Sequence, residues 1–259
     1  MSATQAFLLG LIQGLTEFLP VSSSGHLEIG NHFLGITGGD NFVFTLTVHV
    51  ATVLSTLVVL RKEILRILRG ILEFKMNKET TLFLKLLLSI IPVAIIGLFF
   101  REQVESLFEG DLLVVGICLL VTAALLAFAS FYKGKQVHEI SWSHSFIIGI
   151  AQAIAVLPGL SRSGSTIATG ILLGNKRREV AEFSFLMVLL PVLGAAFIDL
   201  TNVDFIGGPG ILPLGIGLVT AFVTGFLACS WMIKIVSKGK LIYFAGYCLV
   251  IGLISIFTA

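Results

Sequence analysis

Charged residues are scarce in this chain of 259 residues, because Asp, Glu, Lys and Arg together make up only 12% of it while hydrophobic residues make up 56%. A soluble domain carries about a quarter charged residues. This composition, with a mean hydropathy of +1.02, excludes that class and indicates a polytopic helical membrane protein. The first basic residue is Arg61. A secretory signal needs positive charge before its apolar run, so none is expected.

Cysteine is also rare. Cys118, Cys229 and Cys248 lie in apolar runs and have no CxxC spacing. They are therefore interpreted as small hydrophobic residues inside helices. No cluster of His and Cys supports a zinc site.

Long apolar runs are abundant. Runs of about 17–25 residues can cross a bilayer as a helix, and such runs occur near 43–60, 82–100, 112–132, 180–200, 211–233 and 241–258. Two further apolar regions, 3–35 and 145–174, are interrupted by Pro and Gly. Each predicts two short helices joined by a polar break, which is typical of a re-entrant hairpin. Non-helical backbone at membrane depth requires surrounding protein or a water-filled cavity.

The two interrupted regions are copies of each other. Adding 139 to a residue number carries one onto the other without a gap, and eight identities at this offset fall in the two regions and just beyond them. The identical pairs are Gly10/Gly149, Gln13/Gln152, Ser22/Ser161, Ser24/Ser163, Gly25/Gly164, Leu34/Leu173, Gly35/Gly174 and Phe44/Phe183. We interpret the chain as a single membrane domain, 1–259, with repeat one at 1–132 and repeat two at 145–259.

Lys and Arg predict the orientation of these repeats. If the six spans alternate and both hairpins return to the side they left, fifteen of the seventeen basic residues fall on one side, which is then cytoplasmic. The opposite loops, 101–111 and 201–204, are acidic. The first hairpin then enters from outside and the second from inside. Three spans per repeat invert the second copy, which predicts an inverted-topology repeat whose breaks meet near the midplane.

Polar residues gather at the two breaks. The first offers Gln13, Thr16, Glu17, Ser22, Ser23, Ser24, Gly25 and His26, and the second Gln152, Ser161, Arg162, Ser163, Gly164, Ser165 and Thr166. Gln13 and Glu17, four apart, share a helix face. Ser22 or Ser23, and Ser161, occupy N-cap positions of the second half-helices. Helix N-termini with Gly and Ser backbone bind anions.

This set of side chains favours phosphoryl transfer to water. Ser23 is a candidate nucleophile, Glu17 and His26 a candidate acid/base pair, and Arg162 a planar cation suited to phosphate oxygens. The residues expected to bind substrate are Gln13, Ser22, Ser24, Gly25, Ser161, Ser163, Gly164 and Thr166. Alternatively, Glu17 and Arg162 only pair with each other and hold the repeats together. His49 lies within a predicted span and fits no motif.

A divalent cation fits the same cluster. Mg²⁺ and Ca²⁺ prefer oxygen ligands, and the Glu17 carboxylate together with phosphate oxygens would supply them. We therefore expect Glu17 to hold Mg²⁺ or Ca²⁺ together with phosphate oxygens.

The chain resembles the undecaprenyl-diphosphate phosphatase family of bacteria, which is also known through bacitracin resistance. Its signatures are matched by Gln13, Glu17 and the run Pro20 to His26, by Pro158 to Thr166, and by Glu182 to Leu186. The resemblance covers essentially the whole chain. Gln13 stands where many members have Glu, which leaves a metal or hydrogen-bonding role for it but puts an acid/base role in doubt.

The resemblance implies an enzyme of the bacterial inner membrane that removes the terminal phosphate of a C55 isoprenoid diphosphate, so that the carrier re-enters peptidoglycan synthesis. The family's functional residues correspond to Gln13, Glu17, Ser23, His26, Ser161, Arg162 and Thr166, with either Ser23 or His26 as the attacking group. The implied partners are this lipid and the membrane, without nucleic acid, and a homodimer is compatible with the sequence.

One alternative function remains at this point. An inverted repeat by itself is also typical of a lipid flippase or a secondary transporter. In either case the site is expected to open outside, because Glu17, Ser23 and His26 all belong to the hairpin that enters from that side.

The charge distribution predicts that both termini are external. Single cysteines placed at Ser2 or Thr258, in a background without the three native cysteines, should react with a membrane-impermeant maleimide added outside intact cells. A cysteine at Lys135 should react only after the membrane is made permeable. Cytoplasmic labelling of either terminus would contradict the inverted-repeat interpretation.

Overall fold

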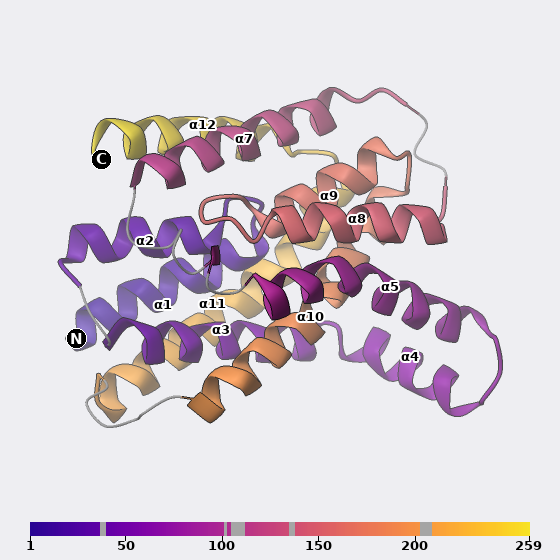
Figure 1. Cartoon of the computed structure of the whole chain (residues 1–259), viewed down its shortest axis with the longest axis horizontal. Coiled ribbons are helices and arrows are strands. Elements are labelled where there is room, and N and C mark those ends of the chain that lie inside the picture. Colours follow the sequence, from indigo (N-terminus) through magenta and orange to yellow (C-terminus); the bar gives the residue numbers. More distant parts are fainter. Residues whose placement is uncertain (37–39, 101–102, 105–111, 135–137, 203–208) are drawn as a thin grey trace.

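The computed structural model describes residues 1–36, 40–100, 103–104, 112–134, 138–202 and 209–259, and every named element in these ranges is a helix (Figure 1). The helices are α1 (Ala3–Phe18), α2 (Ser23–Leu34), α3 (Asp40–Val59), α4 (Arg61–Leu72), α5 (Lys78–Phe99), α7 (Leu112–Phe131), α8 (Trp142–Ile154), α9 (Arg162–Leu172), α10 (Arg177–Asn202), α11 (Ile211–Ser237) and α12 (Ile242–Phe257). The predicted all-α class is confirmed. Most of the two predicted acidic loops lies outside the described residues.

Four helices are long and apolar enough to cross a membrane. They are Phe42–Val59, Lys78–Phe99, Leu112–Phe131 and Ile211–Ser237, and they correspond to four of the six predicted spans. Helix α12 is apolar but shorter, at 16 residues. Side chains of α10 are described only as far as residue 194, so this span stays a prediction.

Both interrupted regions fold as two short helices with a break between them. Leu19, which precedes Pro20, has an extended backbone and ends α1, because proline disfavours helical geometry in the residue before it. Helix α2 then begins after Ser22, whose hydroxyl accepts a hydrogen bond from the Gly25 N–H. In the second region, α8 ends at Ile154 and α9 begins after Ser161, whose hydroxyl accepts from the Gly164 N–H. The predicted N-cap positions at Ser22 and Ser161 are confirmed.

The first helix of each interrupted region packs against a helix from the other half of the chain. Helix α1 lies along α11, and α8 lies along α5. Equivalent glycines make both approaches. A Cβ atom on Gly10 would come within 2.8 Å of the Gly217 carbonyl oxygen, and one on Gly149 would collide with the Ser89 carbonyl. Small residues allow this backbone contact, which drives helix association where lipid removes the hydrophobic effect.

The two breaks touch in the centre of the bundle. A Cβ on Gly25 would lie 2.9 Å from the Gly159 Cα, and one on Gly164 would lie 3.3 Å from the Pro20 Cβ. The Ser163 hydroxyl also donates to the Leu19 carbonyl across 3.2 Å. The polar residues of both breaks are thereby brought into one place.

The two ends of the bundle are distinct. Both termini lie at the same end (Figure 1), as the alternation of spans predicts, whereas the α4–α5 turn and the segment that leads into α8 lie at the opposite end. Which end faces the cytoplasm stays a prediction.

Because α1 packs closely on α11, one methyl group added at this contact should lower the stability of the protein. In Gly14→Ala the new Cβ would collide with the Thr224 hydroxyl and lie 2.6 Å from the Ala221 carbonyl oxygen. We expect destabilisation by about 1–3 kcal/mol, measured as a lower midpoint of thermal unfolding in detergent. Gly246→Ala is the matched control, because no atom of the described residues lies within 4 Å of its added Cβ. Equal midpoints for both variants would contradict this packing.

Candidate active site

Glu17, in the last turn of α1, is the centre of the polar cluster. Its Oε2 accepts hydrogen bonds from Gln13 Nε2 at 2.8 Å and from the Ser23 hydroxyl at 2.6 Å. Its Oε1 accepts from Arg162 Nη2 at 2.8 Å. The predicted nucleophile, Ser23, and the predicted cation, Arg162, therefore both contact the carboxylate of the predicted acid/base residue, Glu17.

The Glu17–Arg162 contact joins residues 145 positions apart and links the two breaks. The Glu17 side chain is only 10% exposed. A buried charge without its partner costs about 3–5 kcal/mol, so the pair stabilises the arrangement in which the two breaks touch. Arg162 is 29% exposed, and the cavity described below reaches it.

The start of α2 directs Ser23 toward Glu17. Ser22 serves as the N-cap, which leaves the hydroxyl of Ser23, the first helical residue, free to contact the carboxylate. Ser22 adopts φ +68°, a left-handed conformation that costs a non-glycine residue about 1–2 kcal/mol. Strain of this kind is concentrated at functional sites. The Ser22 and Ser24 hydroxyl oxygens lie 3.3 Å apart.

The start of α9 presents Arg162 in a similar way. Ser161 is the N-cap, and its own N–H donates to the Thr122 hydroxyl at 3.0 Å, which attaches this break to α7. The Thr166 hydroxyl donates to the Arg162 carbonyl at 2.9 Å. Ser161 and Thr166 therefore support the backbone that carries the guanidinium group.

His26 contacts neither Glu17 nor Arg162 through a hydrogen bond in the described part of the chain. Its Nδ1 lies 2.8 Å from the Ser22 carbonyl oxygen, and its Nε2 lies 2.8 Å from the Tyr247 hydroxyl of α12. Because a carbonyl only accepts, Nδ1 carries a proton, and in the neutral ring Nε2 accepts from Tyr247. The rings lie parallel with centroids 5.5 Å apart.

A cavity of about 30 Å³ lies beside Glu17 and Arg162. That volume holds about one or two water molecules. Glu17, Gln152, Arg162, Thr166 and Ser184 provide polar lining, while Phe185 and neighbouring residues of α10 provide an apolar wall. The cavity therefore joins the Glu17–Arg162 pair to an apolar wall.

Three buried polar atoms near this cavity have no hydrogen-bond partner among the described residues. They are Gln13 Oε1, Gln152 Nε2 and Ser184 Oγ. Leaving such a group unpaired costs about 1–3 kcal/mol, so a hydrogen-bonding partner at any of the three positions would stabilise the site.

Sequence reasoning missed several residues of this site. His49 Nε2 lies 4.0 Å from Glu17 Oε2, although His49 fits no motif. Thr52 and Thr56 line the cavity on the same face of α3. Their spacing after His49, three and seven positions on, is a polar stripe within an apolar run and could have indicated them. No local pattern distinguishes Tyr247.

These observations define the class of protein to which the chain belongs. The chain is a multi-pass helical membrane protein, with a buried cluster of carboxylate, hydroxyl and guanidinium groups where two interrupted helix pairs meet. The model of the family described as bacitracin resistance protein BacA matches residues 6–254, and the chain belongs to that family.

Relatives span the full length of the chain. A protein of Parabacteroides distasonis named undecaprenyl-diphosphatase is 56% identical, covering 99% of this chain and 98% of its own. A protein of Bacteroides thetaiotaomicron with the same name is 55% identical over 100% and 99% of the two chains. One of Christiangramia forsetii, also so named, is 49% identical over 100% and 99%.

Replacing Arg162 by Lys should abolish most activity although the charge is kept, because Lys cannot present two donors in one plane. We expect kcat/KM for phosphate release to fall by roughly 10- to 100-fold, the value of a hydrogen bond to a charged group. Arg178→Lys is the matched control, since Arg178 is exposed and pairs with Glu182 on the surface of α10. Near-normal turnover of Arg162→Lys would show that Arg162 is only a structural counter-ion.

Proposed function

We propose that this chain hydrolyses undecaprenyl diphosphate to undecaprenyl phosphate and inorganic phosphate, which returns the lipid carrier to peptidoglycan synthesis. The observation that carries the proposal is the contact of the Ser23 hydroxyl and the Arg162 guanidinium with the two oxygens of one buried carboxylate. The names of the full-length relatives support the same substrate.

The 2.6 Å contact between Ser23 Oγ and Glu17 Oε2 is that of a nucleophile with its general base. In the proposed first step, Glu17 accepts the hydroxyl proton while Oγ bonds to the terminal phosphorus. The bond from that phosphorus to the bridging oxygen breaks, and undecaprenyl phosphate leaves. Glu17 then gives its proton to the departing undecaprenyl phosphate or to solvent. In the second step, the regenerated carboxylate deprotonates a water molecule that attacks the phosphoserine, the bond from phosphorus to Ser23 Oγ breaks, the carboxyl group returns the proton to Oγ, and inorganic phosphate leaves.

Arg162 and the start of α9 bind the phosphate oxygens in this proposal. Phosphoryl transfer is catalysed chiefly by positioning and by stabilising charge on those oxygens. The guanidinium uses Nη2 to contact Glu17. The Arg162 and Ser163 backbone N–H groups stand at the positive end of the helix, where anions bind.

We assign His26 to binding of the inner phosphate of the substrate rather than to attack on the terminal phosphorus. Its Nε2, the nitrogen whose lone pair would attack, is engaged by the Tyr247 hydroxyl at 2.8 Å, whereas the Ser23 hydroxyl contacts a base. We propose that His26 and Tyr247 contact the inner phosphate, where the Tyr247 hydroxyl, or Nε2 of the protonated imidazole ring, donates to the leaving oxygen.

We propose that a divalent cation binds at Gln13 and Glu17. Gln13 Oε1 is a buried acceptor without a partner among the described residues, and Gln13 Nε2 already contacts the Glu17 carboxylate. Gln13 and Glu17 would hold Mg²⁺ or Ca²⁺, which prefer such oxygen ligands. A bound cation would neutralise charge on the diphosphate oxygens.

The reciprocal packing of α1 on α11 and of α8 on α5 supports the inverted repeat and its two re-entrant hairpins. With the basic residues cytoplasmic, the hairpin that carries Glu17, Ser23 and His26 enters from the outer face of the inner membrane. The active site is therefore proposed to open outside. A water-soluble diphosphate analogue should be hydrolysed in sealed, oriented vesicles only when it is on that face.

Ser23→Ala tests the reaction against the flippase or transporter alternative. We expect phosphate release by the purified protein to fall by at least about 10³-fold, while binding of undecaprenyl diphosphate remains. Ser237→Ala, an exposed serine that donates to the Lys234 carbonyl, is the matched control. A Ser23→Ala protein with full phosphate release would remove the proposed nucleophile. A purified wild-type protein without phosphate release, with or without added Mg²⁺ or Ca²⁺, would favour transport.

The attacking residue can be identified chemically. Acid quenching during turnover of substrate labelled in the terminal phosphate should trap label on the protein, because phosphoserine survives acid and phosphohistidine does not. Label that appears only when the quench is alkaline would assign the attack to His26 instead.

A further inference from the structure

Helix α4 stands apart from the catalytic cluster and has three distinct faces. Ile64, Ile67 and Ile71 pack against the hydrophobic core. Leu65, Leu68 and Leu72 form an adjacent apolar stripe that is 49%, 50% and 69% exposed. Lys62, Arg66 and Arg69 follow on the next face and are exposed. Around the helix axis, the face that packs against the core is followed by the exposed apolar stripe and then by the basic face.

The position of α4 in the chain places it at a membrane surface. Candidate span Phe42–Val59 ends just before it and candidate span Lys78–Phe99 begins just after it. Consecutive spans that cross in opposite directions leave the segment between them on one side, so 60–77 lies at the water boundary. An amphipathic helix there places its apolar stripe among acyl chains and its basic face at the headgroups.

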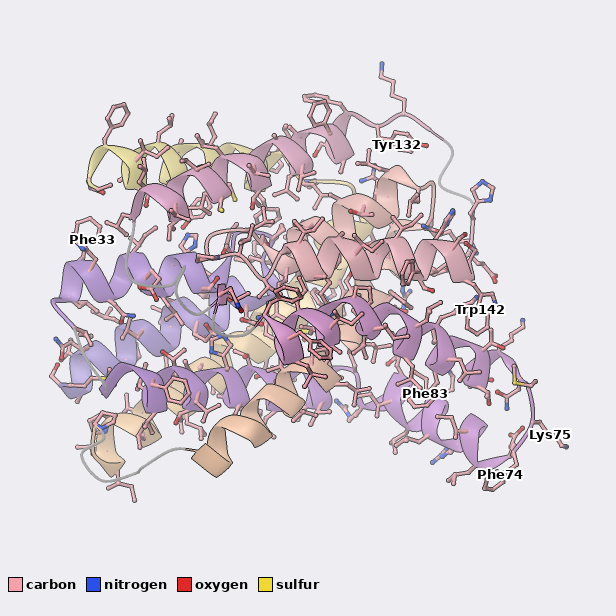
Figure 2. The ribbon with its side chains drawn as sticks, in the orientation of Figure 1. Phe33, Phe74, Lys75, Phe83, Tyr132 and Trp142 are labelled. Atoms are coloured by element: carbon pink, nitrogen blue, oxygen red, sulfur yellow. The ribbon has the colours of Figure 1, made fainter. Side chains whose placement is uncertain are left out.

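The turn after α4 extends the same surface. Phe74 is 90% exposed and Met76 is 73% exposed. Figure 2 shows Phe74 and Lys75 at the far tip of the α4–α5 hairpin, away from the body of the bundle. Phe74 also has φ +51°, which a bulky residue rarely adopts. The fold therefore presents an aromatic ring outward at the cost of backbone strain.

The charge of this segment selects the lipid. Residues 61–78 contain six basic and two acidic side chains. Arg61 donates to the Val58 carbonyl, and Arg66 lies 3.9 Å from Glu79. The side chains of Lys62, Arg69 and Lys75 make no hydrogen bond or ion pair with the described residues, which leaves three cations for another partner. Clustered cations beside a span attract anionic lipid headgroups.

We propose that the surface formed by Leu65, Leu68, Leu72 and Phe74 with Lys62, Arg69 and Lys75 is a binding site for anionic phospholipid. It anchors the α4–α5 hairpin in the membrane interface, at the end of the bundle opposite the termini. The proposal does not depend on the phosphatase reaction, because none of these residues belongs to the Glu17 cluster.

The test uses the full chain in nanodiscs with Phe74→Trp in a Trp142→Phe and Trp231→Phe background, so that the introduced indole is the single tryptophan. Nanodiscs contain phosphatidylcholine with a minor share of phosphatidylglycerol, and either lipid carries bromine on its acyl chains. We expect bromine on phosphatidylglycerol to quench the introduced indole several-fold more, per mole of lipid, than bromine on phosphatidylcholine. In Lys62→Gln/Arg69→Gln, which leaves Lys75 as the remaining cation of the site, this preference should fall by at least about half, as each cation near the surface contributes appreciably.

Lys238→Gln/Lys240→Gln is the matched control, since it removes two cations from the α11–α12 turn on the same predicted side and should leave the preference intact. Unchanged undecaprenyl-diphosphate binding in every variant would show that the fold is retained. Equal quenching by the two brominated lipids would overturn the anionic-lipid site. Absence of quenching by both would place Phe74 in water or against a protein partner and would also overturn it.

Discussion

A carboxylate inside an apolar bundle is the constraint on which the rest of the structure depends. The Glu17 side chain is nearly buried, and its oxygens are satisfied by Gln13, Ser23 and Arg162. Arg162 comes from the other half of the chain, so the carboxylate has this charged partner only when both breaks meet. A buried ion pair of this kind adds little net stability but makes the loss of either partner costly. The chemistry and the assembly of the two halves therefore share one contact.

Glycine and serine residues allow the two breaks to come into contact. Two interrupted helices can place their ends side by side only if no side chain separates their backbones, and Gly25 beside Gly159 meets this condition. The capping serines then provide acceptors for N–H groups that a helix start leaves unpaired. Inside an apolar helical bundle, where water is scarce, such internal satisfaction is a requirement rather than an addition.

The site also retains features that oppose stability. Ser22 has a left-handed backbone, and Gln13, Gln152 and Ser184 each keep a buried polar atom without a described partner. Other buried atoms without a described partner, such as Asn31 Oδ1 and Ser130 Oγ, do not line the cavity. A protein selected only for stability would replace such groups by apolar ones. At the cavity, a bound water or ligand would supply the missing partners.

Local patterns in the sequence were enough to determine the all-helical class, the two breaks, the capping serines and the candidate residues Glu17, Ser23 and Arg162. Proline geometry, helix capping and hydrophobic run length act between near neighbours, so a linear sequence contains them. Only the tertiary structure decided that Glu17 contacts both Ser23 and Arg162, that His26 turns instead to Tyr247, and that His49 and Thr52 join the site. Most of these contacts connect residues tens to hundreds of positions apart, and their partners are set by how helices pack, which no local spacing encodes.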